Sequence, residues 1–220
     1  MDRFTTDLQP DDPRIRLADA TRRIIDELSS STADDETYGA ARDLVEQATA
    51  VLKARDHRRS YDSPAEASLT DFGDMSFVDY SPFFGVLNPL APPIRMSVGA
   101  LESDTEVVGA VVFGDAYEGP PGCVHGGFIA GGFDEVLGFT QARSGQPGMT
   151  ARLEINYRSP TPLHRELEFR GRLVGIDGRK IHTTAELLVA EDRRVCATAA
   201  AMFISMKPEV FERLMRERSG

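Results

Sequence analysis

Apolar positions near the start of the chain recur at helical spacing. Over residues 14–59, a short apolar face precedes a longer one, which comprises Leu44, Val45, Ala48, Val51 and Leu52. Between the two faces, Ser31, Thr32 and Asp34 supply side chains that can cap the start of a helix. We therefore expect two helices, solvated on their charged sides, in an N-terminal extension over residues 1–60.

Residues 61–93 have a different character, because proline, glycine and aromatic residues interrupt both the helical and the strand period. The part over residues 80–93 is too apolar for a free linker. We therefore expect this connecting segment to lie over another surface. Its aromatic part, residues 72–84, either packs against the sheet predicted below or covers a channel, and packing is the simpler expectation.

After residue 93 the pattern becomes that of β-strands. Residues 94–101 and 105–113 form an expected pair, joined at residues 102–104. Asp177 and Gly178 predict a later hairpin turn, because glycine tolerates the positive φ that this turn requires. Further strands are expected over residues 152–157, 167–173, 181–189 and 195–206. The last of these runs is apolar on both faces, so we expect it to be covered on each side.

One helix interrupts this series of strands, from Gly126 to about Ala142. Its apolar residues spread around the whole helix, which indicates a buried helix; they are Phe128, Ile129, Phe133, Val136, Leu137 and Phe139. Two strands, a buried helix and four strands form the order of a hotdog fold, an α+β architecture in which a curved antiparallel sheet wraps around a long helix. We assign this domain to residues 94–207 and expect a helical tail over residues 208–220.

The start of this helix is suited to binding a carbonyl oxygen. The first N–H groups of a helix lack partners within the helix, and the helix dipole adds positive potential there. Gly126 and Gly127 carry no side chain that would shield these donors. Such donors polarise a carbonyl and stabilise the oxyanion that forms from it. His125, immediately before them, either orients the turn or contacts the substrate.

Two acids, Asp134 and Glu135, lie in the middle of the same helix among apolar residues. A buried carboxylate is costly unless another group pairs with it or a reaction uses it. We therefore expect Asp134 to be desolvated and to act as a general base or as a nucleophile. The alternative is that Asp134 faces solvent or a buried arginine.

The spacing of these groups has a geometric consequence. Gly126 and Asp134 are eight residues apart, which corresponds to roughly 12 Å along a helix. A single carbonyl cannot contact both groups of one chain. If both are catalytic, each site combines Gly126 of one subunit with Asp134 of another, and the protein is an obligate dimer. For Gly127 and Gly131, close packing of another backbone is at least as good an explanation as a functional role.

Composition narrows the class of protein without identifying a reaction. The chain has 220 residues, is 41% hydrophobic and 27% charged, and carries a formal net charge of −10. This charge argues against a nucleic-acid partner, which would require a basic patch. No apolar run reaches the ~18–20 residues of a membrane span. Two cysteines are too few for a disulfide framework, so we expect a cytoplasmic protein.

Several other kinds of site are disfavoured by the motifs that the sequence lacks. There is no His-Glu-x-x-His and no Cys-x-x-Cys, so we expect neither a metal nor another cofactor. There is no Gly-x-Ser-x-Gly elbow of a serine hydrolase. Cys123 lies two residues before His125, but neighbouring loop residues rarely orient as a nucleophile–base pair. Cys196, in an apolar strand, is expected in the core.

These motifs, in this order, resemble the hotdog acyl-CoA thioesterases of the phenylacetic-acid-degradation (PaaI) type in the thioesterase superfamily. The resemblance covers residues 80–206. It rests on Gly119-Pro120-Pro121-Gly122, on His125-Gly126-Gly127, on Asp134 nine residues after the histidine, and on residues 149–163. It implies hydrolysis of a fatty acyl-CoA, of medium or long chain, to free acid and CoA by a homodimer or a dimer of such dimers.

The resemblance also implies a role for each matching residue. The backbone N–H of Gly126 polarises the thioester carbonyl, and Asp134 of the partner subunit is the catalytic carboxylate. Thr150 helps to place the attacking water, and His125 supports the turn. The remaining implied contacts are with the substrate, through Gly127, Asn156 and Arg158.

Arg158 is implied to contact the nucleotide end of CoA, and a solvated strand end is the alternative. One departure concerns Gly119, which stands where some relatives carry an asparagine that binds the carbonyl. The Gly-Pro-Pro-Gly loop instead fits the branch that acts on fatty acyl-CoA.

A second class of function remains open. The same binding surface would serve a non-catalytic acyl-CoA-binding regulatory or interaction protein, with the N-terminal helices as a partner-binding module. Asp134 and Thr150 together favour hydrolysis, because a binding protein needs neither. A hotdog dehydratase is a weaker third alternative, since His125 at a helix start is poorly placed to abstract a proton.

Overall fold

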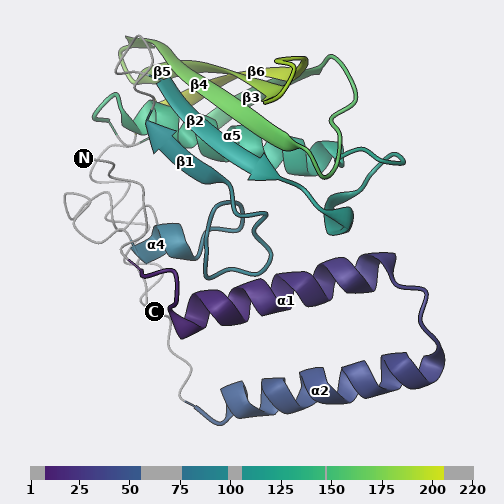
Figure 1. The fold of residues 1–220 in the computed structure, drawn as a ribbon. Coiled ribbons are helices and arrows are strands. Elements are labelled where there is room, and N and C mark those ends of the chain that lie inside the picture. Colours follow the sequence, from purple (N-terminus) through teal and green to yellow (C-terminus); the bar gives the residue numbers. More distant parts are fainter. Residues whose placement is uncertain (1–7, 56–75, 99–105, 147, 206–220) are drawn as a thin grey trace.

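The computed structural model describes residues 8–55, 76–98, 106–146 and 148–205. Its centre is a six-stranded antiparallel sheet in the order β1-β2-β4-β5-β6-β3, with helix α5 (Gly126–Ala142) along one face (Figure 1). The strands are β1 (Arg95–Val98), β2 (Glu106–Val112), β3 (Gly148–Tyr157), β4 (Glu166–Asp177), β5 (Lys180–Val189) and β6 (Val195–Ser205). The α+β hotdog fold predicted from the order of elements is confirmed.

The inner face of the sheet carries the core, as the period-two alternation of its strands predicts. In β4, Leu167 and Phe169 are fully buried, whereas the polar residues between and beside them face outward. The hairpin between β4 and β5 is also confirmed. Asp177 pairs with Lys180, and Gly178 adopts a φ of +58°.

Helix α5 has the bounds that the sequence predicts and lies close against β4. A Cβ on Gly132 would lie 2.5 Å from Cζ of Phe169, so a residue without a side chain is required there. The rings of Phe133 and Phe169 meet edge to face with their centroids 5.1 Å apart. Across the same contact, a Cβ on Gly171 would overlap the hydroxyl of Thr140. The glycines therefore set the distance between the helix and the sheet.

The two expected N-terminal helices are present as α1 (Pro13–Ser30) and α2 (Asp35–Lys53). Asp12 and Asp34 cap their starts by accepting backbone N–H groups. Helix α2 lies on the far side of α1 from the sheet (Figure 1) and has no buried residue. Its apolar face is therefore exposed along with its charged face, which the periodicity alone does not predict.

The aromatic segment before the sheet consists of α4 (Ser76–Asp79) and residues 80–94, which we call the strap. The strap folds back on itself through backbone hydrogen bonds, including Gly85 N–H to Ser81 O at 3.1 Å and Ile94 N–H to Phe83 O at 2.9 Å. A side chain at Gly85 would lie 2.5 Å from the Ser81 nitrogen, so the turn requires glycine.

The expectation that this segment lies over another surface is confirmed for its described part, and the surface is α5. The ring of Phe84 in the strap meets Phe139 of α5 edge to face, with centroids 4.8 Å apart. Phe83 lies over Gly131, where a Cβ would overlap its ring. The aromatic residues of the strap thus pack on the central helix, whereas Ile94 at the end of the strap reaches Gly109 of β2.

One arginine of α1 fixes the strap from the other side. Nη2 of Arg22 donates to the carbonyl oxygens of Gly85, Val86 and Asn88 at 3.0, 2.9 and 2.8 Å. Its Nε donates to the carbonyl of Ala91 at 3.0 Å. Because the guanidinium holds several donors in a rigid plane, one side chain binds four carbonyl oxygens of an irregular segment. Helix α1 is thereby coupled to the strap.

Two predictions near the end of the chain have different outcomes. The expectation that the last apolar run is covered on both faces is wrong for the single chain: Cys196 and Phe203 in β6 are buried, whereas Ala200 is exposed. Thr198, Met202 and Ile204, which alternate with the buried residues, are likewise only half-buried. The expected turn at residues 102–104 and the helical tail over residues 208–220 lie outside the described residues.

The packing of α5 against β4 gives a first prediction. Gly132→Ala should lower the free energy of unfolding by about 1–3 kcal/mol, because the added methyl group forces the ring of Phe169 to move in a filled core. Gly39→Ala in helix α2 is the control, since nothing lies within 4 Å of a Cβ there and α2 is remote from α5. It should raise the free energy of unfolding by up to about 1 kcal/mol. Chemical denaturation measures both, and equal effects would contradict the close approach.

Candidate active site

The loop before α5 is held from both sides by backbone hydrogen bonds. Val124 N–H donates to the carbonyl of Thr161 at 2.9 Å, and His125 N–H donates to the carbonyl of Tyr117 at 2.9 Å. Within the loop, Gly122 adopts a φ of +70°, which glycine tolerates without steric cost. The start of α5 is therefore fixed on both sides, by Tyr117 just before the loop and by Thr161 beyond β3.

Of the first two backbone N–H groups of α5, one is hydrogen-bonded within the described chain and the other is not. Nδ1 of His125 accepts the N–H of Gly127 at 3.0 Å as the N-cap of the helix, which places the ring proton on Nε2. In the described part of the chain, no protein atom accepts the N–H of Gly126. Gly126 therefore presents the available donor at the positive end of the helix dipole. His125 orients the turn, and the donor of Gly127 is already occupied.

Tyr157, which sequence reasoning did not single out, braces this turn. Its hydroxyl donates to the carbonyl of Gly126 at 2.9 Å, and a Cβ on Gly126 would lie 3.3 Å from that hydroxyl. The alternation of inward and outward side chains along β3 could have identified Tyr157. It follows Leu153 and Ile155 at the same two-residue spacing and therefore points to the same, inner face of the sheet. A hydroxyl at the end of an inward series is placed to reach the helix.

Asp134 and Thr150 are brought together, as the resemblance implies. The Thr150 hydroxyl donates to Oδ1 of Asp134 at 2.8 Å, and both residues are exposed in the single chain. The expectation that Asp134 is desolvated is therefore wrong for one chain. The helix directs this residue toward β3, at the edge of the sheet, and not into the core.

Glu135 is the acid that the fold partly buries. Its Oε1 lies 3.5 Å from the hydroxyl of Ser81 in the strap. Burial, followed by the negative charge of Asp134, raises the pKa of Glu135 from 4.5 to about 7. The sequence contained part of this signal, because Glu135 shares a helix face with Gly131 and Phe139, both of which contact the strap.

The two halves of the candidate site remain apart in a single chain. Gly126 and Asp134 belong to the same uninterrupted helix, so about 12 Å separates them along its axis. The open face of α5 runs between them and comprises Gly127, Ala130, Asp134 and Gly138, which are exposed or half-exposed.

The strand beside this open face has one unpaired edge. Strand β3 pairs only with β6 in the described sheet. Two of its large apolar residues, Met149 and Tyr157, are 58% and 56% exposed. Long edge strands with unpaired N–H and C=O groups are templates for pairing with another chain.

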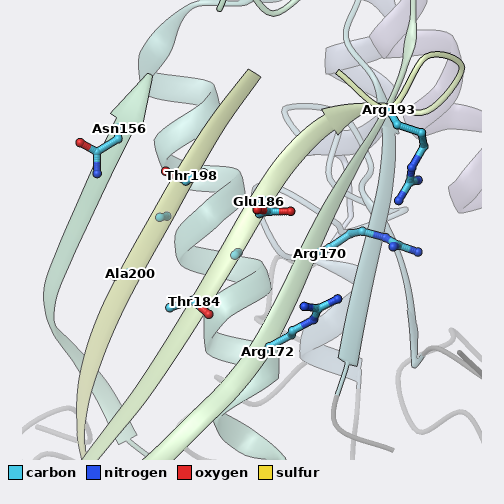
Figure 2. A pocket seen from close by; sticks show the side chains of 10 residues that line it. Asn156, Arg170, Arg172, Thr184, Glu186, Arg193, Thr198 and Ala200 are labelled. Carbon is cyan, nitrogen blue, oxygen red and sulfur yellow. The ribbon is translucent and has the colours of Figure 1, made fainter. Parts of the chain in front are cut away.

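A separate hollow of about 350 Å³ lies on the outer face of the sheet (Figure 2). Arg170, Arg172 and Arg193 flank its floor of small residues. These arginines pair with acids: Arg172 with Glu106 at 3.1 Å, and Arg193 and Arg170 with Glu168 at 2.7 and 3.3 Å. Together with Glu186 in the lining, three acids balance three arginines, so the hollow is polar but carries little net charge.

Two of the implied substrate contacts are not brought to the start of α5. Asn156 lines the outer hollow, on the sheet face opposite the helix (Figure 2). Arg158 is exposed beyond the end of β3, and its backbone N–H donates to the carbonyl of Cys196 at 2.8 Å. At Gly119, a Cβ would lie 2.8 Å from Cα of His125, so the loop has no room for a side chain there.

Other chemistry has little support among the described residues. No group of three or more His, Cys, Asp or Glu residues in this part of the chain could hold a metal ion. Within the same residues, no helix has the length and apolar character needed to cross a membrane. Cys196 is buried in the core as predicted, and Cys123 is half-exposed in the loop before α5.

Comparison with known proteins identifies the family. A family model described as thioesterase superfamily matches residues 121–197, which include Gly126 and Asp134. A solved crystal structure of a thioesterase superfamily protein is 33% identical, with a TM-score of 0.74, and the match covers 90% of this chain and 97% of that one. The chain belongs to the thioesterase superfamily. The family resemblance expected from the sequence is confirmed.

Two curated relatives of this superfamily member carry a more specific name. The mouse (Mus musculus) protein named acyl-coenzyme A thioesterase THEM4 is 37% identical over 92 residues, which are 42% of this chain and 40% of the mouse protein. The Xenopus laevis protein of the same name is 34% identical over 95 residues, which are 43% of each chain. The match thus spans less than half the length of these relatives.

The strap contact of Glu135 gives a second prediction. Because the folded-state pKa of about 7 lies above the ordinary 4.5, the folded chain holds this proton more tightly than the unfolded chain. The free energy of unfolding should therefore fall as the pH rises from about 4.5 to 7, by at most about 3 kcal/mol, and then level off.

Glu135→Gln should remove most of this fall and should be the more stable protein above pH 7. Urea denaturation at a series of pH values measures the difference between the two proteins. A difference that does not change with pH would show that Glu135 titrates as an exposed acid.

Proposed function

We propose that this thioesterase superfamily member hydrolyses medium- or long-chain fatty acyl-CoA to free acid and CoA, at sites shared between two subunits. The observation that carries the proposal is the hydrogen bond from Thr150 to Asp134, in a chain that also presents the N–H of Gly126, which no described residue accepts. The similarity to proteins named acyl-coenzyme A thioesterase supports the class of substrate.

The two groups supply complementary parts of the reaction. The N–H of Gly126 donates a hydrogen bond to the thioester oxygen, which becomes negatively charged during the reaction. Thr150 occupies Oδ1 of Asp134, which leaves Oδ2 to take a proton from water or to attack the carbonyl carbon directly. If Asp134 activates water, the hydroxyl of water ends on the acyl carbon and Asp134 holds the other proton. If Asp134 attacks, it forms an anhydride with the acyl group, and water then hydrolyses this anhydride to restore the carboxylate and free the acid. On either route the C–S bond breaks with its electron pair on sulfur, and the proton released from water neutralises the CoA thiolate.

A second copy of the chain is required, because one helix holds the two groups too far apart. Pairing at the exposed edge of β3 would place two copies of α5 side by side. A two-fold axis that brings Gly126 to Asp134 of the partner subunit must pass near Ala130, which lies midway between them in the sequence. Gly127 and Ala130 are small, so two helices can approach closely there. A dimer of such dimers is compatible with the same site.

The acyl-CoA-binding alternative has less support. A binding protein needs the donor at Gly126, but it does not need a carboxylate hydrogen-bonded to a hydroxyl at the position of Asp134. The cellular setting that we propose is the cytoplasm, with a role in fatty acid metabolism. Two cysteines without a disulfide suit a reducing compartment.

Loss of the carboxylate gives a third prediction. Asp134→Ala should lower kcat/KM for acyl-CoA hydrolysis by about 10²–10⁴-fold, as expected for removal of a general base or nucleophile. Thiol release from a panel of acyl-CoA substrates measures the rates. The control is Glu46→Ala, which removes an exposed acid of α2 and should leave the rate unchanged. Equal rates for Asp134→Ala and the unmodified protein would contradict the proposed function.

The shared site gives a fourth prediction, through mixed dimers. Gly126→Pro removes the proposed donor but suits the first position of a helix, and His125 already has the extended backbone that precedes proline (φ −62°, ψ 134°). Mixing this inactive variant with inactive Asp134→Ala should restore about a quarter of the activity, because half of randomly mixed dimers carry one intact site.

The matched control for this experiment is Gly126→Ala, which keeps the N–H and adds a side chain at the same place. It should retain more activity than Gly126→Pro. Failure of folded mixed dimers to recover activity would place both catalytic groups in one chain.

A further inference from the structure

The ring of Phe83 lies directly over the backbone of α5. A Cβ on Gly131 would overlap its Cζ, so the ring occupies the space that a helix side chain would otherwise fill. Phe83 is only partly buried, although it packs against the core. One side of the ring therefore contacts the helix, and part of it remains accessible.

This contact borders the candidate site. Gly131 lies three residues before Asp134 and five after Gly126, or about 4.5 and 7.5 Å along the helix axis. Residues three or four apart are neighbours on the surface of a helix, so Gly131, under the ring of Phe83, borders the open face that carries Asp134. An acyl group whose carbonyl lies beside Asp134 meets Phe83 within about one helical turn if it extends toward the helix start.

The position of Phe83 is fixed from several directions. The carbonyl of Phe83 itself accepts the N–H of Ile94 at 2.9 Å. On the side away from α5, Arg22 binds the four strap carbonyls described above. The hydroxyl of Tyr117 donates to a fifth carbonyl, that of Leu90, at 3.3 Å. Phe83 is thus carried on a segment tied to α1 as well as to the loop that positions His125.

We propose that Phe83 limits the size of the acyl group that the site accepts, with Arg22 as the positioning residue that holds the ring in place. This inference rests on the proposed function, because it takes the site beside Asp134 to bind an acyl-CoA. It gives the N-terminal helix α1 a part in substrate selection. The sequence suggested a role for residues 1–60 only under the binding-protein alternative, as a partner-binding module, and favoured simple packing for the aromatic segment.

The direct test is Phe83→Ala, assayed with straight-chain acyl-CoA substrates from butanoyl to palmitoyl. Removal of the ring opens space over Gly131, so the ratio of kcat/KM for palmitoyl-CoA to that for butanoyl-CoA should rise by about tenfold or more. Leu90→Ala is the matched control, since Leu90 is on the same strap but points to solvent. Its ratio should equal that of the unmodified protein. An unchanged or lower ratio for Phe83→Ala would overturn the inference.

The role of Arg22 has a separate test. Arg22→Met keeps an extended side chain but removes all donors to the strap. It should raise the ratio of kcat/KM for palmitoyl-CoA to that for butanoyl-CoA by a smaller factor than Phe83→Ala does. Arg22→Lys, with a single ammonium group, should give an intermediate ratio. Arg23→Met, at the neighbouring exposed position, should change nothing. A variant that only destabilised the fold would lower both rates together and leave their ratio unchanged, which would remove Arg22 from the proposal.

Two further measurements keep the inference separate from the proposed function. Thermal unfolding of each variant identifies proteins that do not fold, and Phe83→Leu replaces Phe83→Ala if the latter fails. Titration with S-alkyl-CoA thioethers of increasing length measures the size limit without hydrolysis. If the unmodified protein binds the thioethers but hydrolyses no acyl-CoA, the proposed function fails. The longest thioether that it binds, compared with the longest that Phe83→Ala binds, still tests the role of Phe83. If it hydrolyses all substrates with the same preference as Phe83→Ala, only the inference fails.

Discussion

The fixed rise of an α-helix is the constraint on which the account of this protein depends. Gly126 offers a donor at the first turn of α5, and Asp134 offers a carboxylate two turns later. A helix packed along its length against a sheet cannot bend to bring them together. Chemistry that uses both groups therefore requires two copies of the helix, antiparallel and close to Ala130. The exposed edge of β3 and the small residues of the open face fit that requirement.

Different elements pack against different sides of α5, and each side of the helix has its own role. The sheet fixes the helix through glycines at the contact with β4, and the loop stabilised by His125 and Tyr117 fixes its first turn. The strap covers a third side and partly buries Glu135, which leaves Asp134 on the open face. Two adjacent acids thus have different environments because different elements pack against adjacent faces of one helix. A helix held on three sides keeps its reactive groups at fixed positions.

Much of this arrangement is predictable from the sequence, and the predictions that were wrong have a common cause. Periodicity placed α5 and the order of strands, because each depends on local alternation. It could not show which acid the fold partly buries, since that depends on the strap, a segment without a period that packs through Phe83 and Ser81. The prediction that β6 is covered on both faces was wrong for a related reason. Small residues such as Ala200 are apolar whether or not anything covers them, so composition does not report burial there.

The most direct test of the central claim is a crystal structure with a ketone analogue of an acyl-CoA, in which a methylene group replaces the thioester sulfur. The account predicts a carbonyl oxygen about 3 Å from the backbone nitrogen of Gly126 in one subunit. The carbonyl carbon should face the carboxylate of Asp134 from the partner subunit. A carbonyl bound beside Gly126 and Asp134 of the same chain, or an analogue bound in the outer hollow with the open face of α5 vacant, would contradict it.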